Sequence, residues 1–171
     1  DGTNGYELWK SDGTSAGTVM VKDINSDSSG SVTYDPFIAV GNTLYFIAND
    51  GTHGKELWKS DGTSAGTVMV KDINSGSSDS KPGLYAKLTA VGSTLYFSAD
   101  DGTNGHELWK SDGTSSGTVM VKDIRSGYND GIAGYGHQPT AIGNTLYFRA
   151  NGGIHGFDLW KSDGTSSGTV M

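Results

Sequence analysis

The sequence predicts an all-β fold, namely a β-propeller of four-stranded antiparallel blades with about 3.5 blades in the chain. The first observation is a long motif, Leu-Trp-Lys-Ser-Asp-Gly-Thr-Ser-(Ala/Ser)-Gly-Thr-Val-Met, which occurs four times, at 8–20, 57–69, 108–120 and 159–171. Its tryptophans are separated by 49, 51 and 51 residues. Repeats of this length are typical of propeller blades.

The second observation is the pattern inside one unit, residues 36–73, which contains four short strand patterns. They cover 36–40, 43–48, 55–59 and 67–73, and we name them strands A to D. Gly41-Asn42 between A and B suits a two-residue hairpin turn of type II′ or I′. Loop-forming residues fill 49–54 and 60–66. The whole chain is one repeat domain with further units at about 86–124 and 138–171 and a partial C–D unit at 1–24.

The third observation concerns the faces of the strands. The patterns Leu-Tyr-Phe and Val-Met-Val are apolar on both sides, and no stretch shows helical periodicity. A sheet with one solvated face would alternate more strictly, whereas blades stack face to face. Half a propeller leaves uncovered sheet edges and faces. We therefore expect either a homodimer that closes a seven-bladed ring or a piece of a longer repeat array.

Composition excludes several classes of protein. The net charge of −7 argues against a nucleic-acid partner, which usually requires a basic face. No apolar run is long enough to span a membrane. The chain has no cysteine, which removes disulfide and thiolate chemistry. The pattern Gly-x-Ser-x-Gly occurs only inside the repeated C–D turn, once in each of the four copies, beginning at Gly13, Gly62, Gly113 and Gly164. An enzyme needs one unique site, and this repetition argues against a nucleophile. We therefore expect a protein that is not an enzyme.

The segment Glu7–Thr14, with copies that begin at Glu56, Glu107 and Asp158, resembles the ELWxxDGT-repeat family of bacterial secreted and surface proteins. The repeats cover the whole chain. The resemblance implies a propeller-like fold and an extracellular or cell-surface location in a bacterium. The family is defined by its repeat, so the resemblance implies no reaction. The fourth copy departs from the pattern, with Asp158 for Glu and Gly152-Gly-Ile for Asp-Gly-Thr.

The turn between strands C and D, Ser11–Thr18 in the first copy, resembles more weakly the Asp-box of sialidases and other propellers. It has the composition and the blade position of that box but not its spacing. Asp-boxes are structural turns that lie away from the active site. This resemblance supports a scaffold role.

Acidic residues in the loops raise the question of calcium. The aspartates of the four Asp-Gly-Thr turns favour a structural role, since a carboxylate can hold a tight turn. Asp50, Asp100 and Asp101 are weak calcium candidates, because calcium requires six to eight oxygen ligands and no dedicated calcium loop is present. We predict no metal site and no cofactor, with calcium left open.

Two other residue types repeat with the strands. The tryptophans favour packing between blades over sugar stacking, since large aromatic side chains dominate the energetics of cores. The glutamates at 7, 56 and 107 favour a structural hydrogen bond over a unique catalytic acid.

Recognition, if present, is expected in the loops that vary between units. These are the B–C loops, which follow strand B, and the D–A linkers at 25–35, 74–87 and 125–138. Simple tolerance to sequence drift explains such linkers equally well. The candidate ligand-binding residues in these segments are Tyr34, His53, Tyr85, His106, Tyr128, Tyr135, His137 and His155.

The sequence thus favours an extracellular, non-enzymatic propeller that serves as a structural or interaction scaffold. One alternative is a carbohydrate-binding lectin with a shallow site on each blade, where repeated sites provide avidity for glycans. A second alternative is a calcium-stabilised adhesin.

Overall fold

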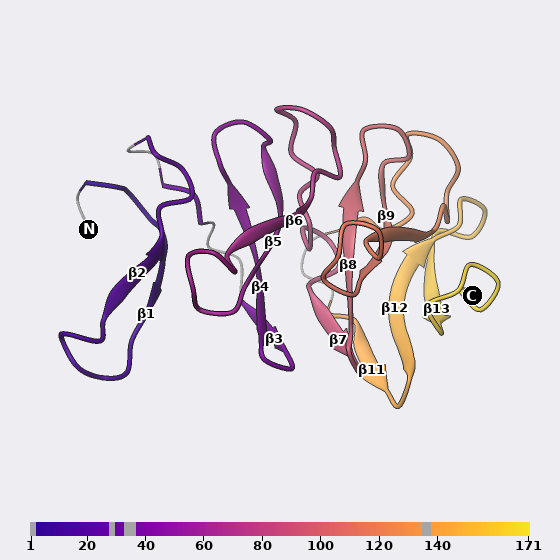
Figure 1. Cartoon of the computed structure of the whole chain (residues 1–171). Helices are drawn as coiled ribbons and strands as arrows, with labels where there is room; N and C mark the ends of the chain where they lie inside the picture. Colours follow the sequence, from indigo (N-terminus) through magenta and orange to yellow (C-terminus); the bar gives the residue numbers. More distant parts are fainter. Residues whose placement is uncertain (1–2, 28–29, 33–36, 135–137) are drawn as a thin grey trace.

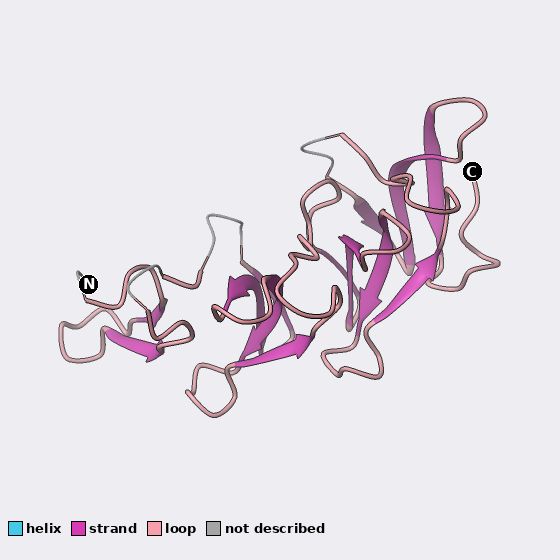
Figure 2. Ribbon diagram, turned by 90° about the horizontal axis from the view of Figure 1, so that it is seen from above, coloured by secondary structure: helices cyan, strands magenta, loops and turns pink. Residues whose placement is uncertain are grey.

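The computed structural model of the 171-residue chain describes residues 3–27, 30–32, 37–134 and 138–171. All regular structure in these residues is β, with thirteen strands in four antiparallel sheets. The sheets follow one another in chain order, and the termini lie at opposite ends of the row (Figure 1). The view from above shows an open row and not a closed ring (Figure 2). No described segment forms a helix long and apolar enough to cross a membrane.

Each sheet is a meander in which neighbouring strands are also neighbours in the chain. The first sheet contains β1 (Leu8–Lys10) and β2 (Val19–Lys22). The second contains β3 (Ile38–Val40), β4 (Thr43–Asn49), β5 (Lys55–Ser60) and β6 (Val68–Lys71). The third contains β7 (Thr89–Val91), β8 (Thr94–Asp100), β9 (His106–Ser111) and β10 (Val119–Lys122). The fourth contains β11 (Thr140–Ile142), β12 (Thr145–Asn151) and β13 (Phe157–Ser162).

These strands confirm the predicted A–B–C–D order, in which β3 to β6 are strands A to D of the second unit. Strand D is shorter than the predicted 67–73. In the fourth sheet, the place of strand D holds a single antiparallel bridge between Lys161 and Val170. The A–B hairpin pairs Val40 with Thr43, so Gly41-Asn42 is a two-residue loop as predicted. Gly41 has a φ of 59° and Asn42 has a negative φ, which fits type II′ and not type I′.

The hydrophobic core lies between the sheets. Alternate side chains of a strand point to opposite faces. We call the face toward the next sheet in the chain the forward face and the opposite one the backward face. The forward face of the second sheet contributes Tyr45, Ile47 and Leu57 to a core that also contains Phe97 and Trp109 from the backward face of the third. Two further cores of the same kind join the first sheet to the second and the third to the fourth. The middle sheets are therefore buried on both faces, which explains their doubly apolar strands.

The tryptophans confirm the packing interpretation at three of four positions. Trp58, Trp109 and Trp160 are buried in the three cores. Trp9 is 43% exposed, because no described sheet lies against the backward face of the first sheet. The same residue in the same motif is therefore covered or exposed according to its neighbour.

Candidate functional site

The Asp-Gly-Thr motif closes the C–D turn on itself. In the second unit, Asp61 Oδ1 accepts hydrogen bonds from the amide and hydroxyl of Thr63, at 2.9 and 2.7 Å. The Thr63 hydroxyl accepts the amide of Gly66 at 2.9 Å, and a Cβ at Gly66 would overlap the Asp61 carboxylate. These hydrogen bonds lower the pKa of Asp61, and the Thr63 hydroxyl contributes more than the Thr63 amide. The same bonds recur in the other three turns, so this motif builds the turn.

Lysines of strands C and D connect each sheet to the next, in contacts that we call lysine clamps. Lys59 Nζ donates to the Gly113 carbonyl at 2.8 Å, and Lys71 Nζ donates to the Thr118 carbonyl at 2.8 Å. Both acceptors belong to the C–D turn of the following unit. The other clamps join Lys10 to Gly62, Lys22 to Thr67, Lys110 to Gly164 and Lys122 to Thr169. The prediction from sequence missed these lysines, although their repetition at fixed motif positions was a usable signal.

Where the preceding sheet has a strand B, a tyrosine of that strand lies against the glycine whose carbonyl accepts the lysine. A Cβ placed on Gly113 would overlap the Tyr45 hydroxyl, and a Cβ on Gly164 would overlap the Tyr96 hydroxyl. Both glycines also have a φ of 88°, a conformation that strongly favours glycine. The glycine of the motif therefore both permits the turn and accommodates the tyrosine of the preceding unit.

The repeated glutamate ties each D–A linker to strand C. Glu56 is buried and accepts the amides of Ile73 and Ser80, at 3.0 and 3.1 Å, and the Ser80 hydroxyl at 2.6 Å. Burial raises the pKa of Glu56 to about 7, against the opposing effect of these hydrogen bonds. Glu107 holds the following linker in the same way, and burial raises its pKa to about 8. These carboxyl groups are closed off by their own linkers, which fits the structural role predicted for them.

The B–C loops are capped by their own side chains. Asp50 Oδ1 accepts the amides of Thr52 and His53 at 2.9 Å, and Asp50 Oδ2 lies 2.7 Å from His53 Nδ1. This hydrogen bond raises the pKa of His53. In the third unit, Asp101 accepts the amides of Thr103 and Asn104 in the same arrangement. The fourth unit has Gly152 at this position and lacks that carboxylate.

The calcium candidates are used by these same loops. Asp50 and Asp101 cap their loops as described, and Asp100 Oδ1 accepts the Gly102 amide at 2.8 Å. Among the described residues, no group of three or more His, Cys, Asp or Glu side chains is placed to hold a metal ion. The three aspartates are thus engaged by the amides of their own loops.

The structure brings two of the candidate ligand-binding residues together. The rings of Tyr85 and His106 pack edge to face with centroids 4.6 Å apart, and His106 Nδ1 lies 3.2 Å from Asp130. His106 is buried, and its Nε2 has no hydrogen-bond partner among the described residues. Tyr128 is 81% exposed in the same linker as Asp130.

The remaining candidates form no common site with this pair. His53 caps its own loop, and His155 is exposed in the last B–C loop, at the edge of a cleft of about 280 Å³ beside Trp160 and Met171. Tyr34, Tyr135 and His137 lie outside the described residues. The predicted binding residues therefore do not converge on one pocket in the described part of the chain.

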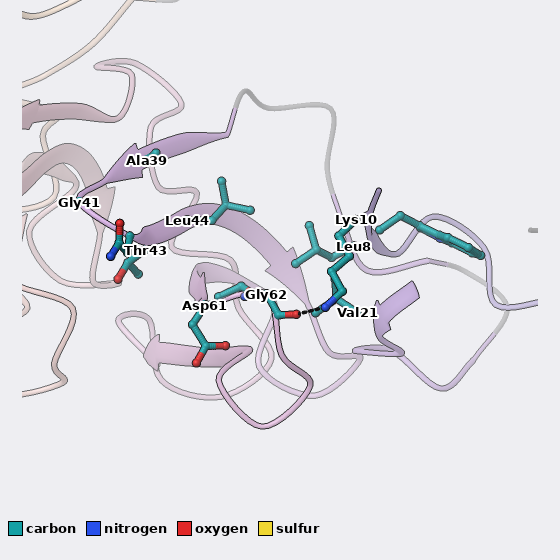
Figure 3. Close-up of a pocket in the computed structure, with 12 residues that line it drawn as sticks. Leu8, Lys10, Val21, Ala39, Gly41, Thr43, Leu44, Asp61 and Gly62 are labelled. Carbon is teal, nitrogen blue, oxygen red and sulfur yellow. Dashed lines mark hydrogen bonds between the residues drawn. The ribbon is translucent and has the colours of Figure 1, made fainter. Parts of the chain in front are cut away.

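A second cleft of about 280 Å³ separates the first and second sheets. Figure 3 shows Leu8 and Val21 on one side and Leu44 and Gly62 on the other, with Lys10 reaching across to the Gly62 carbonyl. The first sheet has no strand B, so no tyrosine covers Gly62, and nothing lies within 4 Å of a Cβ built there. The cleft is therefore the place that strand B fills in the other units.

No family model, curated protein or solved structure matches this chain. The likeness to ELWxxDGT repeats consequently rests on the motif itself.

Proposed function

We propose that the chain is a non-enzymatic structural and interaction scaffold of the β-propeller type, located outside a bacterial cell. The observation that carries this proposal is that the repeated polar side chains form structural hydrogen bonds. Asp61 closes a turn, Glu56 holds a linker and Lys59 connects two sheets. Their counterparts in the other inner unit do the same. The polar part of the motif is thus used to build and join the units.

The packing of the sheets supports the identification of each sheet as a blade. Strands A of successive sheets contact one another, β3 with β7 and β7 with β11. Inner strands gathered around an axis would make such contacts. The second and third sheets are four-stranded meanders, and each of the first three sheets buries its forward face on the backward face of the next, as propeller blades do. The extracellular and bacterial parts of the proposal rest on the likeness to ELWxxDGT repeats.

A crystal structure tests the architecture directly. We expect successive sheets related by a similar rotation about one axis that passes beside β3, β7 and β11. Sheets stacked by translation alone, with no common axis, would contradict the propeller.

A glycan array tests the function against the lectin alternative. We expect no binding below about 1 mM, since three of the four tryptophans are buried and unavailable for sugar stacking. Submillimolar binding that is lost in Tyr128→Ala, while the control variant Tyr6→Ala keeps it, would instead support a lectin. Both tyrosines are exposed, so neither change disturbs a core.

A further inference from the structure

The last sheet has an uncovered forward face. Leu159 on this face is 69% exposed, whereas its counterparts Leu57 and Leu108 are fully buried. Ile142 is also exposed, although Val91 at the same position of the third sheet is buried. In the inner units, this face is covered by the next sheet.

The same face carries an unused lysine clamp. Lys161 stands at the motif position of Lys59 and Lys110, whose ammonium groups donate to a Gly carbonyl of the next C–D turn. The Lys161 side chain is exposed and makes no hydrogen bond within the described residues. Tyr147 likewise has no following glycine to cover and is less buried than Tyr96.

The opposite end of the row presents the matching groups. The turn of the first unit contains Gly13, at the position of Gly62, Gly113 and Gly164. Nothing lies within 4 Å of a Cβ built on Gly13, and no lysine of the described chain reaches its carbonyl. Trp9 lies exposed on the same backward face.

Charge is complementary between the two ends. Beyond the hydrogen bonds from their own threonines, the pKa values of Asp61, Asp112 and Asp163 are lowered by a lysine of the preceding unit. The pKa of Asp12 is lowered by hydrogen bonds from Thr14, and no lysine contributes to this shift. Lys161 and Asp12 are thus the two unmatched members of a pair that occurs three times inside the chain.

We propose that two copies of this chain dock head to tail. The forward face of the fourth sheet of one copy then packs on the backward face of the first sheet of the other copy. Lys161 of one copy donates to the Gly13 carbonyl of the other. Tyr147 of the first copy covers the same Gly13, and Leu159 packs toward Trp9 of the second copy. The three internal junctions are the template for the lysine and leucine contacts, and the second and third junctions are the template for the tyrosine contact. The inference rests on the proposed scaffold function and names its partner. Such an interface is heterologous, so it forms a ring if the rotation closes and an open chain otherwise.

Two single variants that block opposite ends test the proposal. Leu159→Glu blocks the forward end and Trp9→Glu blocks the backward end, while Lys87→Glu, an exposed site in a linker, is the charge control. Light scattering over a concentration series should show wild type and Lys87→Glu above the monomer mass of 17.9 kDa. Each blocked variant should stay monomeric. An equimolar mixture of the two should form a 1:1 dimer and nothing larger, because one intact interface remains.

Other outcomes overturn the proposal. A wild-type chain that is monomeric at every concentration would contradict it. A Trp9→Glu variant that still forms homodimers would also contradict it, because such dimers indicate a symmetric contact. Circular dichroism checks that each variant folds, and Lys161→Glu provides a milder block if one does not. The scaffold function is tested separately by the glycan array, whose result does not depend on whether copies associate.

Discussion

The third and fourth sheets share most of their sequence but differ in their surroundings. Both contain Thr-Leu-Tyr-Phe in strand B and Leu-Trp-Lys-Ser in strand C. Leu108 of the third sheet is fully buried, and Leu159 of the fourth is largely exposed. Lys110 binds the next turn, and Lys161 has no turn to bind. The comparison shows that burial belongs to the junction between units and not to the unit, as expected for a repeat protein whose stability is a sum of unit and interface terms.

The largest expected difference follows from truncating the same leucine in both sheets. Leu108→Ala should lower the free energy of unfolding by about 2–5 kcal/mol, because it leaves a cavity in a packed core. Leu159→Ala should change it by less than about 0.5 kcal/mol at a concentration where the chain is monomeric. Urea unfolding followed by tryptophan fluorescence measures both. Equal losses would show that the forward faces are not distinguished by a neighbouring sheet.

A second difference concerns pH, because the inner units have a buried glutamate where the fourth has Asp158. The pKa of Glu56 rises from 4.5 to about 7 on folding. The folded chain therefore binds more protons than the unfolded chain between these values. The contribution of Glu56 to the free energy of unfolding is complete below about pH 4.5 and is lost as pH rises through 7. The full loss is on the order of 3 kcal/mol.

Unfolding free energies at pH 5 and pH 8.5 check this prediction in wild type and in Glu56→Gln. The glutamine amide can donate to the Ser80 hydroxyl, which lies beside the carboxyl group. The variant should keep the fold and show a smaller decrease with pH, with the raised pKa values of Glu107 and His53 responsible for what remains. A wild type that becomes more stable across this window would contradict the inferred shift.

The lysine clamp gives a smaller contrast. Lys59→Met removes a part-buried hydrogen bond to the Gly113 carbonyl and should cost about 1 kcal/mol. Lys161→Met, the matched change at the uncovered end, should cost nothing measurable in the monomer. Thermal unfolding of both variants at low protein concentration makes the comparison. Identical midpoints for the two variants would mean that the clamps add no stability.

Much of this fold follows from the sequence, because the repeat, the Gly41-Asn42 hairpin and the doubly apolar strands are local patterns. The packing role of Trp58 was also predictable, since the residue repeats in a constant motif. The lysine clamps were harder, because Lys59 finds its acceptor 54 residues away and nothing local identifies the turn that it meets. For the same reason, sequence did not show that Tyr85 contacts His106. The candidate ligand-binding residues of the B–C loops and D–A linkers have residue types in common, and residue type does not show whether side chains converge on one site.

The smallest expected effect is a gain of stability in the fourth sheet. Gly152 replaces the aspartate that caps the B–C loop through two amides in the second and third units. Gly152→Asp should restore that cap beside His155 and stabilise the chain by about 0.5 kcal/mol, with part of the gain from lower entropy of the unfolded chain. The Trp160 ring lies 3.2 Å from the new Cβ and must shift slightly. A lower unfolding midpoint would show that this shift outweighs the cap.

Hydrogen–deuterium exchange tests most directly whether neighbours, and not sequence, determine stability along the row. The experiment compares peptides that cover β8 and β9 with those that cover β12 and β13, at a concentration where the chain is monomeric. We predict slower exchange in β8 and β9, whose sheet is buried on both faces, than in the matching strands of the uncovered fourth sheet. Equal exchange in the two pairs would contradict this explanation, because like sequences would then be equally stable with and without a covering sheet.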